Sequence, residues 1–271
     1  MRKEDTVSAE FSIYNMTTII YDGTYPGWLT AVFEIYEHKL SDVFFAREGE
    51  PAASLFGVTH IVKTDETKAA RVLNGLKQKL SADGLNCLYK TFFSELEKFD
   101  EKMWRFVQYV FASAHNVEGD LSNNAIWEVR QAAKFVHRES HRMKAFIRFK
   151  LTKDQLFYAI VEPDCDVLPL IARHFEKRYA DQRWLIYDAR RKYGIYYDLE
   201  TLSNVELTFD TSAQSLAELY DEREEFFQDM WRRYFGSVNI KARKNLRLHV
   251  QHMPKRYWKY LTEKHPESRL L

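Results

Sequence analysis

The hydrophobic pattern changes its period near residue 143, and this change restricts the fold more than any other feature of the chain. Before it, a strand–helix–strand segment leads into stretches with apolar residues at helical spacing, through about residue 141. After it come short runs of β-branched and aromatic residues separated by turn residues. A helical block followed by successive hairpins predicts an α+β fold with a mostly antiparallel sheet and a C-terminal helical tail.

The length of 271 residues and the 45% hydrophobic content allow one large domain with a substantial core. We expect a single domain over residues 1–271, with a helical sub-domain at 60–142 and the sheet within 143–271. Strands are expected at 143–151 and 156–163, and a second hairpin at 183–199 carries "RRKY" at its tip. Asp164 and Asp166 are expected to cap the helix that follows the second strand.

The charge distribution is uneven although the formal net charge is only +1. Residues 128–153 contain eight Lys or Arg and two acids, and residues 236–271 contain nine Lys or Arg and two acids. These two segments therefore carry +6 and +7, which leaves −12 for the rest of the chain. Two basic segments in an acidic body favour a basic surface patch, provided that folding brings them together.

The helix expected at 122–141 combines an apolar face with a cationic stripe. Its apolar face comprises Ile126, Val129, Ala133 and Val136, and its outer stripe comprises Arg130, Lys134, His137, Arg138 and His141. Cations near a helix C-terminus complement the helix dipole, so a solvated helix end explains the stripe as well as a binding surface does.

The strand expected at 143–151 continues this basic stretch. Strict alternation puts Ala145, Ile147, Phe149 and Leu151 on one face and Phe146, Arg148 and Lys150 on the other. A ring beside two cations suits a sheet that stacks bases and neutralises phosphates. An ordinary open sheet face has the same composition.

Two further segments carry cations beside aromatic residues. Arg190 and Arg191 lie at the tip of the second hairpin, and the tail contains "KRYWK" at 255–259. Such segments are typical of backbone neutralisation combined with base stacking. Alternatively, Tyr257 and Trp258 dock the tail on the core while the cations stay solvated. The residues predicted to bind nucleic acid are Arg138, Arg142, Arg148, Lys150, Arg190, Arg191, Lys255, Arg256, Tyr257 and Trp258.

His137, Glu139 and His141 are candidates for acid–base catalysis, since imidazole titrates near neutral pH. The histidines are spaced i, i+4, but Arg138 occupies the place of the glutamate in the zinc-protease order H-E-x-x-H. We predict no metal site and no cofactor. Cys87 and Cys165 are too few for a cluster, and the P-loop, dinucleotide and serine-hydrolase motifs are absent.

Four ordered segments resemble a known bacterial family. They are "IIYDGTYPGWLTAVFEIYEHK" at 19–39, "HRESHRMKAFIRF" at 137–149, "VLPLIARHFEKRYADQRWLIYDARRKYG" at 167–194 and "HMPKRYWKYL" at 252–261. The chain is similar to DNA-metabolism or DNA-repair proteins that contain a domain of unknown function. Members are typically encoded beside a radical-SAM protein, and a similar domain occurs fused to uracil-DNA-glycosylase-like domains. The resemblance brings no established catalytic residues with it.

These observations predict an accessory protein of DNA repair or modification that binds single- or double-stranded DNA and acts with a radical-SAM partner. The alternatives are an enzyme on nucleic acid or nucleotides, using the His and Glu candidates above, and a scaffold that meets an acidic protein without touching DNA. The N-terminus lacks an apolar signal core and no stretch of about 18 apolar residues is present, so we expect a cytoplasmic protein without a membrane span.

Overall fold

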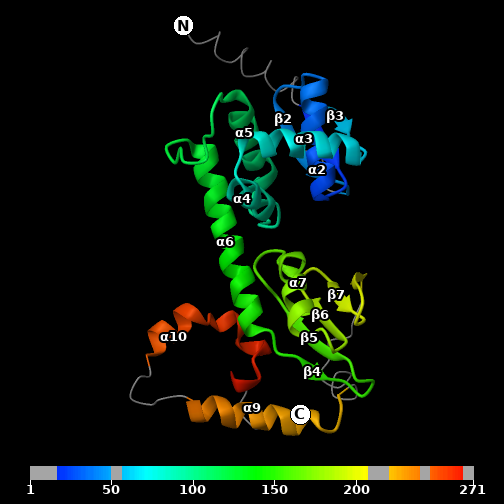
Figure 1. Cartoon of the computed structure of the whole chain (residues 1–271), viewed down its shortest axis with the longest axis vertical. Coiled ribbons are helices and arrows are strands. Elements are labelled where there is room, and N and C mark those ends of the chain that lie inside the picture. The colour runs from blue at the N-terminus through cyan, green and yellow to red at the C-terminus, as the bar shows by residue number, and fades with distance from the viewer. Residues whose placement is uncertain (1–16, 50–56, 207–219, 239–244, 265–271) are drawn as a thin grey trace. The chain divides into compact units, whose positions relative to one another are not determined.

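The computed structural model describes residues 17–49, 57–206, 220–238 and 245–264 (Figure 1). The chain divides into two compact units, Met1–Val136 and His137–Leu271, and the boundary falls inside one long helix. Helices and two sheets confirm the predicted α+β class, and helices follow the second sheet as predicted. Within the described residues, no helix is both long enough and apolar enough to cross a membrane.

The first unit contains a parallel three-stranded sheet of order β2-β1-β3. Its elements are β1 (Thr17–Tyr21), α2 (Tyr25–Glu37), β2 (Val43–Arg47), β3 (Val58–Ile61), α3 (Glu66–Lys79), α4 (Ala82–Phe92), α5 (Phe99–Ala112) and the first part of α6 (Asn124–Phe146). Strand β2 was not predicted from the sequence. Trp28, Leu76 and Met103 are fully buried, because α2, α3 and α5 each turn an apolar face inward.

The second unit contains a five-stranded sheet of order β4-β5-β6-β7-β8. Its elements are β4 (Lys150–Leu151), β5 (Phe157–Val161), α7 (Leu168–Arg178), β6 (Trp184–Asp188), β7 (Tyr193–Tyr197), β8 (Leu202–Glu206), α9 (Glu224–Val238), α10 (Leu246–His252) and the 3₁₀ turns η2 (Lys255–Tyr260) and η3 (Thr262–Lys264). Three of its four strand pairs are antiparallel, as predicted. The pair β5–β6 is parallel, because α7 makes the crossover between these strands.

Strand β6 forms the centre of this sheet, and all five of its residues are buried. Trp184 packs with Phe175 of α7, with their ring centroids 6.1 Å apart, while Leu185 and Tyr187 cluster with Tyr158. Figure 1 shows α7 lying against the sheet, and α7 contacts β7. Strand β6 pairs with β7 so that Asp188 lies opposite Tyr193, which places Arg190 and Arg191 at the tip of the hairpin.

The strand predicted at 143–151 is wrong over most of its length. Helix α6 continues to Phe146, and only Lys150 and Leu151 pair with β5. Met143 and Ile147 are both buried and four residues apart, so this stretch keeps a helical apolar face, and the amide of Ile147 still donates to Met143 O at 3.1 Å. Ala145, predicted to share a buried strand face, is exposed instead.

The long acidic helix predicted at about 212–235 corresponds in part to α9, which runs to Val238. The predicted residues 212–219 lie outside the described residues. The tail is helical as predicted, and Pro254 occupies the position just before η2.

Candidate functional site

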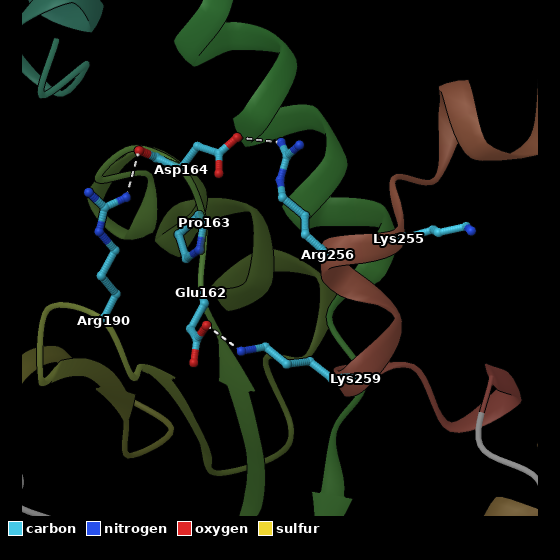
Figure 2. A pocket seen from close by; sticks show the side chains of 7 residues that line it. All are labelled: Glu162, Pro163, Asp164, Arg190, Lys255, Arg256 and Lys259. Carbon is cyan, nitrogen blue, oxygen red and sulfur yellow. Dashed lines mark hydrogen bonds and ion pairs between the residues drawn. The ribbon is translucent and has the colours of Figure 1, made fainter.

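A pocket of about 680 Å³ in the second unit gathers cations from distant parts of the sequence. Its lining residues are Glu162, Pro163 and Asp164 after β5, Arg190 at the β6–β7 tip, and Lys255, Arg256 and Lys259 of η2 (Figure 2). Four cations face two carboxylates, so the lining carries an excess of two positive charges at neutral pH.

Glu139 of α6 is fully buried and binds the segments that form this pocket. The Tyr257 hydroxyl lies 2.6 Å from both carboxylate oxygens, and the backbone amide of Asp164 donates to Oε1 at 3.0 Å. Arg256 Nη2 lies 3.2 Å from Oε2, and Arg142 Nη1 lies 3.5 Å from the same oxygen. One carboxylate thus holds the helix end, the loop after β5 and the tail together.

Tyr257 is a buried part of this arrangement and not a surface ring. Its side chain is 3% exposed and packs against Phe146, with ring centroids 5.5 Å apart. Burial and the hydrogen bond to Glu139 raise the pKa of Tyr257, so its hydroxyl stays protonated and donates. The alternative in which the tail docks on the core therefore describes Tyr257, whose ring is buried against Phe146 and is not an open surface for a base.

Two ion pairs cross the pocket (Figure 2). Arg256 Nη2 lies 2.5 Å from Asp164 Oδ2, and Lys259 Nζ pairs with Glu162 Oε2. Burial by itself raises the pKa of Glu162, but hydrogen bonds from Lys259 and Tyr260 outweigh it and hold the pKa below its ordinary value. These pairs fix the tail beside the end of β5.

Arg190 and Lys255 differ from Arg256 and Lys259 in their ion pairing. Arg190 is exposed and donates from Nη1 to the carbonyl oxygen of Asp164 at 3.2 Å. Lys255 is exposed, lies 5.9 Å from the Trp258 ring and points away from the two ion pairs (Figure 2). Among the described residues, neither cation pairs with a carboxylate.

Arg191, beside Arg190 in the sequence, is held inside the fold by hydrogen bonds and does not face the pocket. Its Nη1 lies 2.6 Å from Asp188 Oδ2 and 3.2 Å from Pro163 O, and its side chain is largely buried. Asp188 is fully buried and also accepts from the backbone amides of Arg190 and Arg191. The sequence therefore predicted two equivalent tip cations, whereas only Arg190 turns toward the pocket.

Arg148 and Lys150 do not form the predicted sheet platform with Phe146. Arg148 pairs with Glu263, with Nη2 2.9 Å from Oε1, and its guanidinium lies 5.0 Å from the Trp231 ring. It lines a second pocket of about 530 Å³, which shares no residue with the first. Lys150 lies over Tyr220 at 4.9 Å, and burial lowers its pKa. The alternating faces were wrong because the backbone there is mostly not a strand.

The remaining candidates on α6 lie on both sides of the helix. His137, Arg138 and His141 are exposed, whereas Glu139 is buried. Residues two positions apart point to nearly opposite sides of a helix, so Glu139 is separated from both histidines. The geometry therefore does not assemble the predicted acid–base group.

The caps predicted for α7 are also wrong. Val167 occupies the N-cap position, and no side chain caps the helix. Asp164 binds Arg256 instead, and the Tyr193 hydroxyl donates to Asp166 Oδ1 at 2.5 Å. Pro169 lies in the first turn, where its missing N–H costs no helical hydrogen bond.

Sequence reasoning missed Glu162, Asp164 and Lys259 as parts of the site. "EPD" directly follows an apolar strand, and the end of a strand beside a parallel neighbour is a common place for functional groups. Lys259 lies four residues after Lys255, which was a weaker signal. Trp258 is half-buried, and its indole Nε1 donates to Met253 O at 3.0 Å.

Fold and site together define an α+β protein with a cation-rich pocket at the end of a buried strand. The family model for the domain of unknown function DUF4130 matches residues 97–263, more than half of the chain, and the chain belongs to that family. No curated protein matches the chain in sequence.

Proposed function

We propose that this chain binds DNA through the cation-rich pocket of its second unit and serves as an accessory protein of DNA repair or modification. The presence of Arg190, Lys255, Arg256 and Lys259 in the lining of one pocket carries the proposal. Phosphate contacts dominate nucleic-acid affinity when no base-reading motif is present, and the sequence contains no recognisable helix-turn-helix or zinc finger.

Arg190 and Lys255 are the principal phosphate-binding residues in this proposal. Both are exposed, and neither must leave a carboxylate before it meets a phosphate oxygen. Arg256 and Lys259 are held by carboxylates, and their ion pairs keep the pocket in shape. Arg138, exposed on α6 in the same unit, is a further candidate for phosphate contact.

A radical-SAM protein is the partner that we propose for the reaction itself. The resemblance of four ordered segments to proteins encoded beside such an enzyme supports this role. The two cysteines of this chain, Cys87 and Cys165, are too few to hold an iron–sulfur cluster, so the partner would supply it.

The test uses fluorescent single- and double-stranded oligonucleotides of unrelated sequences, titrated at several salt concentrations. Arg190→Ala with Lys255→Ala should weaken binding about equally for all sequences. It should also lower the slope of log affinity against log salt by about one unit for each phosphate that is no longer neutralised. Arg173→Ala with Lys177→Ala is the control, because it removes the same charge from exposed positions of α7.

Equal weakening in both double variants would mean that net charge, not this pocket, attracts DNA. No binding at low salt by the wild-type chain would contradict direct DNA contact. Binding of polyglutamate as tight as that of DNA would favour the scaffold alternative, in which the basic surface meets an acidic protein.

A further inference from the structure

Helix α2 and strand β3 of the first unit bring together two histidines and a glutamate. None of the three belongs to the cation-rich pocket of the second unit. Glu34 and His38 are spaced i, i+4 at the end of α2, and His60 lies on β3. One ligand atom from each residue lies within 4.8 Å of the others. We propose that Glu34, His38 and His60 bind a divalent transition-metal ion of the zinc type, which departs from the expectation of no metal site drawn from the sequence.

The central contact joins Glu34 and His60. His60 Nε2 lies 2.7 Å from Glu34 Oε2, a separation that one shared proton spans. Zinc bonds to imidazole nitrogen and carboxylate oxygen are about 2.0–2.2 Å, so an ion between these atoms needs them about 3.3 Å apart. An opening of about half an ångström would let the metal replace the proton.

His38 supplies the third ligand from the C-cap of α2. Its ring centroid lies 5.4 Å from that of His60, and its side chain is 50% exposed, so it has room to rotate toward the ion. It occupies the C-cap position of the helix, where the carbonyl groups give a partial negative charge that favours a cation.

Lys68 of α3 orients the Glu34 carboxylate and leaves one of its oxygens available to the metal. Its Nζ lies 2.9 Å from Glu34 Oε1, which leaves Oε2 for the metal. The Glu34 side chain is only 13% exposed, so its orientation is fixed by packing and by this ion pair. Metal-binding carboxylates usually have such a second hydrogen-bonding partner.

The ligand set determines the class of ion. Two imidazoles and one carboxylate suit zinc and its first-row neighbours, whereas Mg²⁺ and Ca²⁺ prefer oxygen ligands. Three protein ligands leave the fourth tetrahedral position to water. The ion would link the C-terminal end of α2 to β3, which is an edge strand of the described sheet.

The test strips the purified full-length chain with a chelator and titrates Zn²⁺ against a competing indicator. We expect one ion per chain, and about tenfold or greater weakening in both His60→Ala and Glu34→Gln. Mg²⁺ should not compete. His115→Ala removes an exposed histidine elsewhere in the same unit and should bind like the wild type.

Thermal unfolding gives a second measurement that does not depend on the indicator. Zn²⁺ should raise the Tm of the wild type and of His115→Ala but not that of His60→Ala, whose Tm in chelator reports whether it is folded. Zinc stoichiometry that is unchanged in His60→Ala, or reduced equally in His115→Ala, would overturn the proposal. DNA binding through the cation-rich pocket is measured separately and does not depend on this outcome.

Discussion

At the scale of single residues, Glu139 shows how burial can turn a predicted catalytic residue into a structural one. In the sequence it lies between two histidines, and this pattern suggests a role in acid–base catalysis. In the structure its carboxylate accepts from Tyr257 and from the amide of Asp164, and it pairs with Arg256. A buried carboxylate with this many partners is a structural centre of its unit.

Replacing Glu139 with alanine should therefore cost stability. The substitution leaves the Tyr257 hydroxyl and the Asp164 amide without their acceptor and Arg256 with one ion-pair partner fewer. We expect the free energy of unfolding to fall by about 3–5 kcal/mol, as when one partner of a buried pair is removed. Urea denaturation followed by circular dichroism measures it.

Glu128→Ala on the same helix provides the control. Glu128 pairs with an exposed Arg105, and such surface pairs contribute about 1 kcal/mol or less. If both variants unfold at the same urea concentration, the central structural role of Glu139 is wrong.

The buried pair of Arg148 and Glu263 predicts a pH dependence. Burial by itself raises the pKa of Glu263, but hydrogen bonds from Arg148 and Trp231 outweigh it and hold the pKa below its ordinary value of 4.5. A carboxyl whose pKa is lower in the folded state stabilises the fold above the unfolded pKa. This contribution is lost as the pH falls through the folded pKa.

Glu263→Gln should consequently be less stable than the wild type at pH 7, and the difference should shrink as the pH falls below about 4. Unfolding free energies measured from pH 7 to pH 3 test this. Glu225→Gln, at an exposed position of α9, is the reference. A difference between wild type and Glu263→Gln that stays constant over this range would exclude the proposed linkage.

At the scale of elements, the β6–β7 hairpin requires the two backbones to approach closely at Gly194. Gly194 of β7 lies opposite Tyr187 of β6. A Cβ placed on Gly194 would lie 2.8 Å from Ile186 O and 3.0 Å from Leu185 Cδ1. The hairpin that positions Arg190 thus requires glycine at this point.

Gly194→Ala should destabilise the chain by about 1–3 kcal/mol, because a backbone oxygen must move to admit the methyl group. Gly236→Ala is its counterpart in α9, where a Cβ would meet nothing within 4 Å. Alanine there should raise stability by up to about 1 kcal/mol through helix propensity. Thermal unfolding of both variants measures the two effects, and shifts of the same sign would contradict this account.

At the scale of the whole molecule, the two basic segments do meet within the second unit, but they meet at acidic residues. Arg142 and Arg256 share Glu139, and Arg148 pairs with Glu263 of the tail. Ion pairs with these acids therefore neutralise part of the net charge of +13 that the two segments carry. At the pocket, the exposed cation that the tail segment leaves without a carboxylate among the described residues is Lys255. Arg190 joins it from the hairpin tip, outside both basic segments.

The sequence alone determined most of the secondary structure of this protein. The period of apolar residues predicted the helices of the middle block, including the buried face of α6 at Ile126 and Val129. Turn residues predicted both hairpins of the second sheet. These features are local, so neighbouring residues are enough to specify them. The end of α6 was mispredicted because "AFIRFK" fits either period.

Only the tertiary structure decided which charged residues are available to a ligand. Arg190 and Arg191 are adjacent in the sequence, yet one lines the pocket and the other is held by buried Asp188. Likewise, Glu34 and His60 meet only because β3 pairs with β1 beside α2. The availability of a charge depends on which distant group lies within about 4 Å, and the local pattern that specifies helices and strands contains no such information.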